Sequence, residues 1–361
     1  MTQRVFITGG AGFIGSRLAK ALCATHEVMV FDNFHPQVHG HTRVEEATGL
    51  VGKCHIVRGD VVNAEELHSA IRSFKPDLVY HLAAETGTGQ SYDEPTRYNL
   101  VNVVGTTNLI EAVRSQGDAV RRIVLAGSRA IYGEGAARDA QGRVRNAPAR
   151  RIEDMRRGDF GLKDERGQPL APVATPESLP AAPASVYAST KLMQEYICAQ
   201  CAAGTDLEVA VLRLQNVYGP GQSLRNPYTG VISIFCQQVE RGEWLEVFED
   251  GEIIRDFVYV DDVVDAFSAC ARIARAPASP VNIGSGVPTS ILTMAQSVLK
   301  LYGRSPDDHR ISGNFRAGDV RHAVAEIALA RDLLSWQPRT GFATGLKHFV
   351  EWAKGTQAAL I

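Results

Sequence analysis

The sequence predicts an α/β fold, in which helices cover both faces of a doubly wound parallel sheet, followed by a smaller C-terminal lobe. Three observations support this prediction: short apolar runs alternate with helical patterns, a Gly-rich turn follows the first run, and polar side chains stand where later runs end. The runs have the near-continuous apolar character of strands that are buried on both faces. Alternation of this kind favours right-handed crossovers between parallel strands.

Five apolar runs are expected to form the first strands, at residues 4–8, 27–31, 54–59, 77–83 and 121–127. The segments between them have the apolar spacing of helices and are expected at residues 13–26, 63–74 and 98–116. Regular patterns resume later in the chain, with a helix expected over 184–200 and a strand over 208–219.

Two domains are expected. Residues 1–215 would form a nucleotide-binding domain, and residues 216–361 would form mainly a substrate-binding lobe, with some segments returning to the main sheet. The first domain carries an insertion at 134–183, which is rich in Arg, Asp, Gly and Pro. Because a structureless loop of that length is unusual in a compact domain, the insertion is expected to be an ordered segment, a lid or a partly mobile segment.

The bulk composition excludes several classes of protein. The 361 residues carry a formal net charge of -2, which gives no support for a nucleic-acid or anionic-membrane partner. No apolar run reaches the roughly 18 residues of a membrane span, and a strand begins close to the N-terminus, so we expect a cytoplasmic protein. Cys198 and Cys201 form a CxxC pair late in a helical pattern, without a second pair, and we assign no metal.

The segment "VFITGGAGFIGSRLAKAL" has the order strand, Gly-rich turn, helix. Gly9, Gly12 and Gly15 allow a tight turn and the close approach of a pyrophosphate to the helix N-terminus, where Phe13 and Ile14 also lie. Asp32 ends the next strand and is followed by Asn33. A carboxylate there accepts hydrogen bonds from both adenosine ribose hydroxyls and repels a 2′-phosphate. The pattern therefore predicts a Rossmann-type site for NAD rather than NADP.

Asp60 and Val61 end the third predicted strand. Asp60 could contact the adenine amino group, or it could cap the following helix. The sequence leaves both interpretations open.

A group suited to proton transfer follows the fifth strand. Ser128 stands at the strand end, and "YASTK" places Tyr187 and Lys191 one helical turn apart. A nearby ammonium and the positive nicotinamide ring would both favour the phenolate form of Tyr187 and so lower its pKa. Hydride transfer from an alcohol needs such a base, and Ser128 would hydrogen-bond the same substrate oxygen.

With these motifs in place, the sequence resembles the extended short-chain dehydrogenase/reductase family, which contains the NAD-dependent sugar-nucleotide epimerases and dehydratases. The resemblance covers nearly the whole chain and rests on "TGGAGFIGS", "HLAA", "NVVGT", "YASTK", "LRLQNVYGPGQ" and "RDFVYVDD". It implies cofactor contacts from Leu82, Ala83, Ala84 and Asn102. It also implies substrate contacts from Asn216, Arg255, Arg316 and Asp319, because Arg offers a planar fork to diphosphate oxygens and Asp accepts from ribose hydroxyls.

The residues after Ser128 distinguish between reactions. Dehydratases of this family place an Asp–Glu pair there, whereas this chain has Arg129 and Ala130. Ala130 has no proton to give, so the chain is equipped for oxidation at C4 and poorly equipped for elimination. A 4-epimerase needs no more than this, since the hydride returns to the other face of the bound 4-keto sugar and NAD is regenerated.

Within the family, "AAETGTGQS", the segment after "LRLQNVYGPGQ" and the long insertion resemble the dTDP-L-rhamnose 4-epimerases, which make dTDP-6-deoxy-L-talose. Glu85 and Thr86 are expected to face the sugar, as is Arg129, with packing or capping roles left open for the first two. The insertion lacks the cysteines often found in that group. Its six arginines between Arg143 and Arg157 could cover the diphosphate, but a solvated charged loop is favoured.

The resemblance also implies a homodimer, in which the helices containing residues 102–113 and 187–200 form a four-helix bundle across a two-fold axis. Three alternatives remain: a UDP-hexose 4-epimerase, a sugar-nucleotide 4-ketoreductase, and a non-catalytic NAD-binding scaffold. The last is disfavoured because a scaffold has no need of Ser128, Tyr187 and Lys191.

Overall fold

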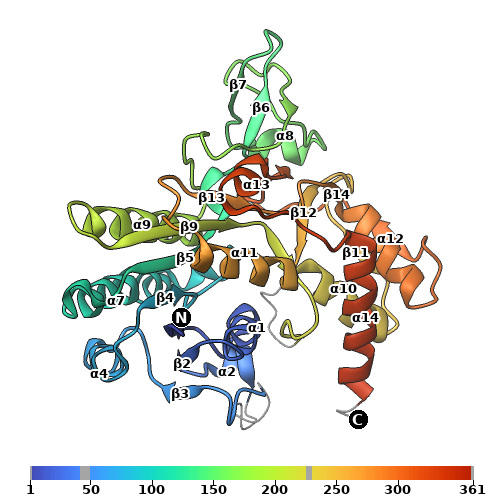
Figure 1. Ribbon diagram of the computed structural model, residues 1–361. Coiled ribbons are helices and arrows are strands. Elements are labelled where there is room, and N and C mark those ends of the chain that lie inside the picture. The colour runs from blue at the N-terminus through green and yellow to red at the C-terminus, as the bar shows by residue number, and fades with distance from the viewer. Residues whose placement is uncertain (1, 41–48, 225–229, 359–361) are drawn as a thin grey trace.

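Within the residues that the computed structural model describes (2–40, 49–224 and 230–358), seven parallel strands form the central sheet (Figure 1). They lie in the order β13-β9-β5-β4-β1-β2-β3. Their bounds are Arg4–Thr8 (β1), Glu27–Asp32 (β2), His55–Arg58 (β3), Leu78–His81 (β4), Arg122–Ser128 (β5), Glu208–Leu214 (β9) and Val281–Ile283 (β13). This arrangement confirms the predicted fold class. The chain runs outward from β1 to β3 and then returns to β4, so the ends of β1 and β4 form the switch point where such sheets bind ligands.

Helices cover both faces of the sheet. Val5 and Ile7 of β1 pack against one layer, while Phe6 between them packs against the other, because successive side chains of a strand point to opposite faces. The first layer consists of α1 (Phe13–Leu22), α11 (Val260–Arg272) and α13 (Ala328–Leu334). The second consists of α4 (Ala64–Phe74), α7 (Gly105–Arg114) and α9 (Val186–Ala202). Short helical segments precede α7 or lie between strands: α2 (Pro36–His39), α5 (Gln90–Asp93), α6 (Pro95–Tyr98), η1 (Asn99–Val104), η2 (Gly117–Ala119) and η3 (Arg129–Tyr132).

The C-terminal part of the chain builds a second hydrophobic core beside the sheet. Its helices are α10 (Val231–Glu240), α12 (Ile291–Leu301) and α14 (Phe342–Ala358). Its strands are β10 (Asn216–Tyr218), β11 (Leu245–Val247), β12 (Ile254–Tyr259), β14 (Pro288–Ser290), β15 (His309–Ile311) and β16 (His322–Ala323). One further strand of this region, β13, lies at the edge of the main sheet beside β9.

The strand expected over 208–219 was predicted too long. It divides at Gln215, whose backbone N–H donates to Ile283 O at 2.9 Å. Beyond this residue the chain leaves the main sheet, and β10 pairs with β12 of the second core. The division places Asn216 where the two cores meet.

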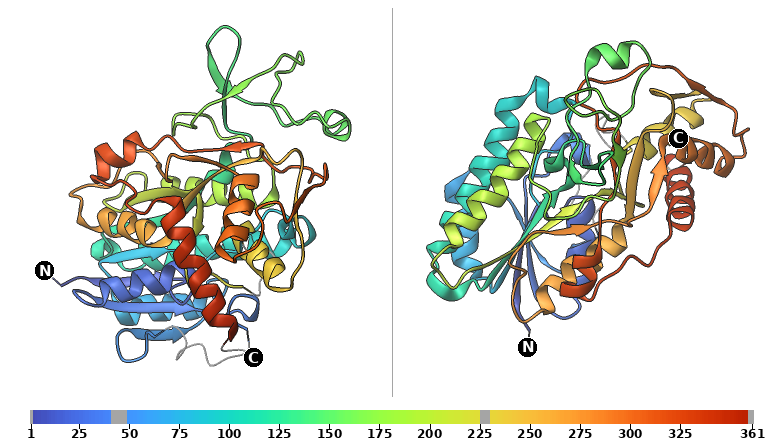
Figure 2. Two further views of the ribbon diagram at one scale, coloured as in Figure 1. Left: turned by 90° about the vertical axis from the view of Figure 1, so that its right-hand side faces the viewer. Right: turned by 90° about the horizontal axis from the view of Figure 1, so that it is seen from above.

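The insertion is an ordered arm that projects from the body (Figures 1 and 2). It contains a small antiparallel sheet of β6 (Ala136–Arg138), β7 (Val144–Asn146) and β8 (Ala171–Pro172), together with α8 (Ile152–Arg156). Buried apolar side chains give the arm its own core, which consists of Ala137, Ala147, Leu162 and Leu170. The insertion therefore has regular secondary structure and a small core of its own. Among the described residues, no helix is long and apolar enough to cross a membrane.

Candidate active site

The turn between β1 and α1 depends on two glycines. Gly9 has a φ of +67°, and a Cβ built on it would lie 2.6 Å from the backbone nitrogen of Ala83. A Cβ on Gly15 would lie 2.3 Å from Gly9 O. Gly12 is the N-cap of α1, so the free N–H groups of the first helical turn point out of this turn. The backbone is thereby left uncovered where a pyrophosphate would approach.

A pocket of about 130 Å³ lies beside this turn. Ten predicted residues line it: Gly9, Gly12, Asp32, Asn33, Asp60, Val61, Leu82, Ala83, Ala84 and Glu85. The lining also contains residues that were not predicted from the sequence, among them His35, Val38 and His39. The one sequence signal of these three is their position just after β2. Phe13, Ile14 and Gly15 begin α1 and are not part of the lining.

Asp32 is held in place by the backbone. Its carboxylate accepts from Ala11 N at 3.0 Å and from Phe34 N at 2.8 Å, and the residue is buried. His39 Nε2 lies 3.9 Å from the same carboxylate. These contacts fix the acid between the Gly-rich turn and the loop after β2.

The structure tests whether Asp60 caps the helix after the third strand. The N-cap of α4 is Asn63, whose side-chain oxygen accepts from Glu66 N at 3.3 Å. Asp60 instead accepts from Val62 N and from the Asn33 side chain, each at 3.0 Å. The capping interpretation of Asp60 was wrong, because the N-cap of the helix stands three residues later, at Asn63.

Ser128 and Tyr187 meet at the end of β5. Ser185 caps α9 by accepting from Ala188 N at 3.1 Å, which places Tyr187 in the first turn of that helix. Burial raises the pKa of Tyr187, while a hydrogen bond with Ser128 and the positive charge of Arg129 act to lower it. In the protein without cofactor, the pKa of Tyr187 is therefore raised overall, and the cation that acts on it is Arg129. The nicotinamide ring, which is expected to lower this pKa, would act only when NAD is bound.

Lys191 is buried one turn further along α9. Burial lowers the pKa of its ammonium to about 8, and Glu195 on the same helix opposes that change. The side chain of Lys191 donates to Gln194 Oε1 at 2.5 Å.

The loop after β4 connects the pocket to Tyr187. Glu85 pairs with Arg97 at 2.7 Å, a partner that no sequence motif indicated. The Tyr98 hydroxyl donates to Thr86 O at 2.7 Å, and the Tyr98 ring packs edge-on against Tyr187 with centroids 6.3 Å apart.

Asn102 lies beneath this loop rather than on the pocket lining. Its side chain accepts from Glu85 N at 2.8 Å and donates to Glu85 O at 3.1 Å and to Thr190 Oγ1 at 2.9 Å. All of its N–H groups are therefore used inside the protein. The structure gives this residue a role in shaping the loop.

The arginines predicted to face the substrate differ in their partners. Arg255 is buried and donates to Asp319 Oδ1 at 2.7 Å and to Val320 O at 2.8 Å. Arg316 is exposed, with its guanidinium 5.1 Å from the centre of the Phe248 ring. Burial and the charge of Arg255 lower the pKa of Arg129 to about 10, and among the described residues its side chain has no hydrogen bond or ion pair.

Asn216 lies at the start of β10, paired in register with Phe257 of β12, the strand that carries Arg255. Its side-chain oxygen is buried and has no hydrogen-bond partner within the described parts of the chain. A buried polar atom without a partner is rare and costly. The Asn216 oxygen therefore has an unused capacity to accept a hydrogen bond.

One arginine of the arm contradicts the expectation of a solvated loop. The Arg150 side chain is 3% exposed and pairs with Glu134 at 3.0 Å and Glu249 at 2.8 Å. It also donates to Asp319 O at 2.7 Å. Glu134 in turn accepts from Arg321 N at 2.6 Å. The root of the arm is thus bound to the segment that carries Asp319.

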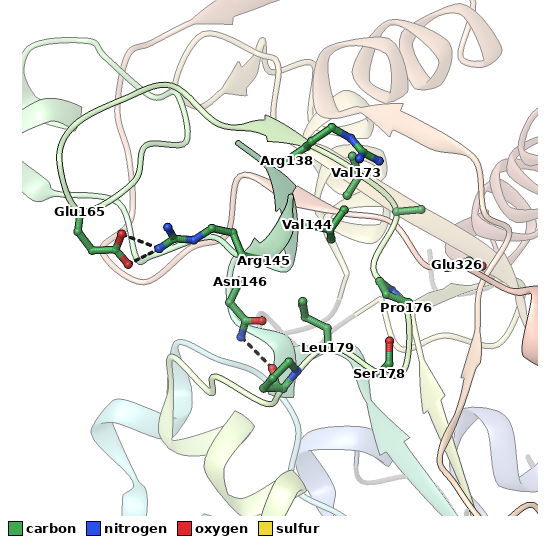
Figure 3. A pocket seen from close by; sticks show the side chains of 12 residues that line it. Arg138, Val144, Arg145, Asn146, Glu165, Val173, Pro176, Ser178, Leu179 and Glu326 are labelled. Atoms are coloured by element: carbon green, nitrogen blue, oxygen red, sulfur yellow. Dashed lines mark hydrogen bonds and ion pairs between the residues drawn. The ribbon is translucent and has the colours of Figure 1, made fainter. Parts of the chain in front are cut away.

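An open hollow of about 900 Å³ lies under the arm (Figure 3). There Arg145 points to Glu165, and the Asn146 side chain donates to Pro180 O at 2.8 Å. None of the predicted site residues lines this hollow.

Cys198 is buried in the core between α9 and the sheet, and burial raises its pKa to about 12. Such a thiol is unreactive. Over the described ranges, no group of three or more His, Cys, Asp or Glu side chains could hold a metal ion.

Known proteins resemble this chain over most of its length. A model of the "NAD dependent epimerase/dehydratase family" matches residues 5–152 and 163–284. A dTDP-L-rhamnose 4-epimerase from Burkholderia thailandensis is 40% identical over 357 residues, covering 97% of this chain and 94% of that protein. A UDP-glucose 4-epimerase from Mycolicibacterium smegmatis is 32% identical over 351 residues, covering 97% of this chain and 98% of that protein.

Solved structures of proteins with related activities are similar to this chain over nearly its whole length. A UDP-glucose 4-epimerase from Thermotoga maritima, crystallised with UDP-glucose, superposes with a TM-score of 0.80 at 28% identity, covering 98% of this chain and 99% of that one. A UDP-glucose 4-epimerase from Thermus thermophilus in complex with NAD gives a TM-score of 0.75 at 27% identity, with 98% and 99% coverage.

Proposed function

The chain belongs to the NAD dependent epimerase/dehydratase family, and we propose that it is a 4-epimerase that interconverts dTDP-L-rhamnose and dTDP-6-deoxy-L-talose. One observation carries the choice of reaction. Ser128 and Tyr187 meet at the end of β5, while Arg129 and Ala130 follow where a dehydratase would need an acid pair. The site can take a proton from a hydroxyl but cannot protonate a leaving hydroxyl through Ala130.

The residues present fit NAD, the cofactor of this family. Gly9 and Gly12 leave the backbone open at the N-terminus of α1, and Asp32 supplies the acid that favours an unphosphorylated ribose. When bound, NAD supplies the acceptor and the donor of the C4 hydride. Because the hydride returns to the same substrate, the proposed reaction consumes no cofactor.

The chain's own residues then handle the proton. Tyr187 is the proposed base, which takes the C4 hydroxyl proton and later returns it. Its raised pKa in the free protein keeps the phenol protonated, so positive charge is needed to release that proton. Arg129 supplies such charge in the free protein, and Lys191, one helical turn from Tyr187, is proposed to supply more. Ser128 is proposed to donate a hydrogen bond to the same sugar oxygen.

The diphosphate and nucleoside are assigned to the second region of the site. The side-chain N–H groups of Asn216 can donate to diphosphate oxygens, while its buried oxygen, which has no partner among the described residues, can accept only from a ligand hydroxyl or N–H. The Arg129 side chain also has no hydrogen bond or ion pair among the described residues. Arg255 and Asp319 form an ion pair with each other, and we propose that this pair lies beside the bound nucleotide. Arg316 is exposed and free to turn toward an anionic ligand. Glu85 and Thr86 are proposed to face the sugar.

The choice of substrate rests on the 40% identical relative, which is a dTDP-L-rhamnose 4-epimerase. A UDP-hexose substrate is the second candidate, favoured by the UDP-glucose 4-epimerases at 32% and 28% identity. A ketoreductase is disfavoured, because it would need a new molecule of reduced cofactor for every turnover. Asp32 and tightly bound NAD instead suit a reaction in which the cofactor is regenerated in place.

The deciding experiment incubates the purified protein with dTDP-L-rhamnose and no added cofactor. The expected result is a new nucleotide-sugar peak on anion exchange, with inverted C4 couplings in its NMR spectrum and no net NADH. Tyr187→Phe serves as the matched control for contaminating activity. Conversion of UDP-glucose but not dTDP-L-rhamnose would select the second candidate, and a demand for stoichiometric NADH would select the reductase.

We also propose a homodimer through α7 and α9. Four large apolar side chains on this face are 40–54% exposed: Leu100, Val104, Met193 and Tyr196. Leu100 and Val104 stand at i and i+4 in η1, the helical segment that leads into α7, and Met193 and Tyr196 stand at i and i+3 in α9. Each pair therefore lies on one face of its helix. Light scattering should report twice the mass of one chain, and Tyr196→Glu should reduce that value; a single-chain mass for the wild type contradicts the dimer.

A further inference from the structure

A chain of buried polar side chains runs from β1 to Lys191 in α9. Thr8 Oγ1 lies 2.7 Å from His81 Nδ1, and His81 Nε2 lies 2.9 Å from Thr106 Oγ1. Gln194 Nε2 lies 2.7 Å from the same Thr106 oxygen, and Gln194 Oε1 lies 2.5 Å from Lys191 Nζ. Every member is at most 3% exposed, so water cannot replace these partners.

The direction of every hydrogen bond follows from Lys191, because an ammonium only donates. Gln194 must turn its oxygen to Lys191 and its amide nitrogen to Thr106. The Thr106 hydroxyl donates to Asn102 O at 2.6 Å, so its oxygen accepts from both Gln194 and His81. The tautomer that fits these bonds has the His81 proton on Nε2 and accepts from Thr8 at Nδ1. The Gln194 nitrogen also lies 3.4 Å from His81 Nε2, and in this tautomer that contact is not a hydrogen bond because both nitrogens are donors.

We propose that Gln194 is a positioning residue, whose carbonyl oxygen holds the Lys191 side chain in the buried, charged state that Tyr187 requires. The inference rests on the proposed role of Tyr187 as the base. Gln194 is fully buried and lines neither of the two cavities described above, so in this proposal it touches no substrate. Its effect passes entirely through the ammonium.

The surroundings of Lys191 make such a partner necessary. Burial lowers the pKa of Lys191 to about 8, so near neutral pH its charge is only moderately favoured. Glu195 and Cys198 on its own helix act to raise that pKa, but Glu195 is shared with Arg213 of β9 at 2.8 Å. His81 of β4 is neutral, because burial lowers its pKa to about 3. A neutral acceptor at Gln194 favours the charged form without adding a charge.

A purely structural role makes a different prediction from a positioning role. If the chain of hydrogen bonds only stabilises the fold, any break in it should lower stability without changing the titration of Lys191. If Gln194 holds the ammonium, removing its acceptor should lower the Lys191 pKa by about one unit, the effect of one charge-assisted hydrogen bond.

The experiment measures the Lys191 pKa directly in the free protein. Lysine side chains are labelled with ¹³C at Cε, the Lys191 resonance is assigned by its loss in Lys191→Arg, and pH titrations are compared. Gln194→Met keeps the length but not the acceptor and should titrate about one pH unit lower. Gln194→Glu keeps the shape and adds a charge, so it should titrate higher than the wild type. Thr8→Val breaks the far end and should lower the unfolding temperature with the Lys191 pKa unchanged.

Activity supplies the second readout. The alkaline limb of kcat/KM for C4 epimerisation should move to lower pH in Gln194→Met and to higher pH in Gln194→Glu. A Lys191 titration that is the same in Gln194→Met, Gln194→Glu and the wild type overturns the inference. Absence of turnover by the wild type on any nucleotide sugar would instead overturn the proposed function, so the two failures are distinguishable.

Discussion

The cofactor region and the substrate region of this site hold their polar side chains by different means. At the ends of β1 to β4, the cofactor region uses backbone groups: Asp32 accepts from Ala11 N and Phe34 N, and the Asn102 side chain binds both backbone groups of Glu85. The substrate region, near Arg255 and Asp319, uses ion pairs between side chains from distant parts of the chain.

This difference indicates how much each region depends on contacts with distant parts of the chain. Backbone contacts form whenever the local turn forms, so the cofactor region is nearly complete once β1, β2 and β4 are aligned. Arg150 and Asp319 are 169 residues apart, and their contact exists only after the arm and the C-terminal core are both in place. Changes in the two regions should therefore separate cofactor binding from substrate binding.

Tyr187 lies where the regions meet, and its change should have the largest effect. Tyr187→Phe removes the proposed proton acceptor and should lower turnover by about 10²- to 10⁴-fold, the usual contribution of a general base. NAD should remain bound, as measured by its release on denaturation. Tyr196→Phe, an exposed position on the same helix, is the control. Turnover within a few-fold of the wild type would reject Tyr187 as the base.

Gly9→Ala should damage the cofactor region alone. Its positive φ costs an alanine about 1–2 kcal/mol, and the added Cβ would meet Ala83 N at 2.6 Å. We expect loss of bound NAD and a lower unfolding temperature, measured on the same preparation. Ala at Gly52, which also has a positive φ but no neighbour within 4 Å, isolates the strain from the collision. NAD content equal to that of the wild type would show that the turn tolerates a side chain.

Arg150→Met should damage the substrate region alone. It leaves Glu134 and Glu249 buried without their partner, at a cost of about 3–5 kcal/mol in the free energy of unfolding. Arg145→Met is the matched control in the same arm, because its partner Glu165 is exposed and the change should have little effect on the free energy of unfolding. Denaturant unfolding and KM measure the two effects. Equal costs for the two variants would mean that the buried cluster does not anchor the arm.

Asn216→Ala should have the smallest effect on the free protein and a measurable one on binding. The Asn216 oxygen has no partner to lose, so stability should be almost unchanged. A lost hydrogen bond to a charged diphosphate should raise KM about tenfold with kcat nearly constant. Calorimetry with dTDP provides the direct test. A stability loss without any change in KM would assign Asn216 to packing.

The contrast between the regions also explains what could be predicted from the sequence. The parallel sheet and its first five strands follow from local patterns of apolar runs. Six residues of the pocket lining follow from glycines and from residues at strand ends, and four more (Leu82, Ala83, Ala84 and Glu85) follow from the family resemblance. Asp32 was predictable because a motif places it, whereas Arg97 was not, because its contact with Glu85 depends on the geometry of a loop.

The errors arise from contacts between distant segments. The strand expected over 208–219 divides because residues far along the chain, in β12 and β13, offer two different pairing partners. Arg150 was taken as one of six solvated arginines, since nothing beside it in the sequence announces Glu249. Burial, which a sequence does not display, raises the pKa of Tyr187 in the protein without cofactor, so the lowering expected from the nicotinamide ring stays a prediction for the NAD complex.

The arm offers a practical point of attachment. Its root is fixed by Arg150, but the hairpin turn at its tip contacts mainly itself: Asp139 accepts from the backbone of Gln141 and Arg143, and Gly142 has a φ of +81°. Such tips tolerate inserted sequence. A fluorophore or affinity tag placed between Gln141 and Gly142 would stand clear of both cores (Figure 2). It would allow the enzyme to be immobilised or observed while it works.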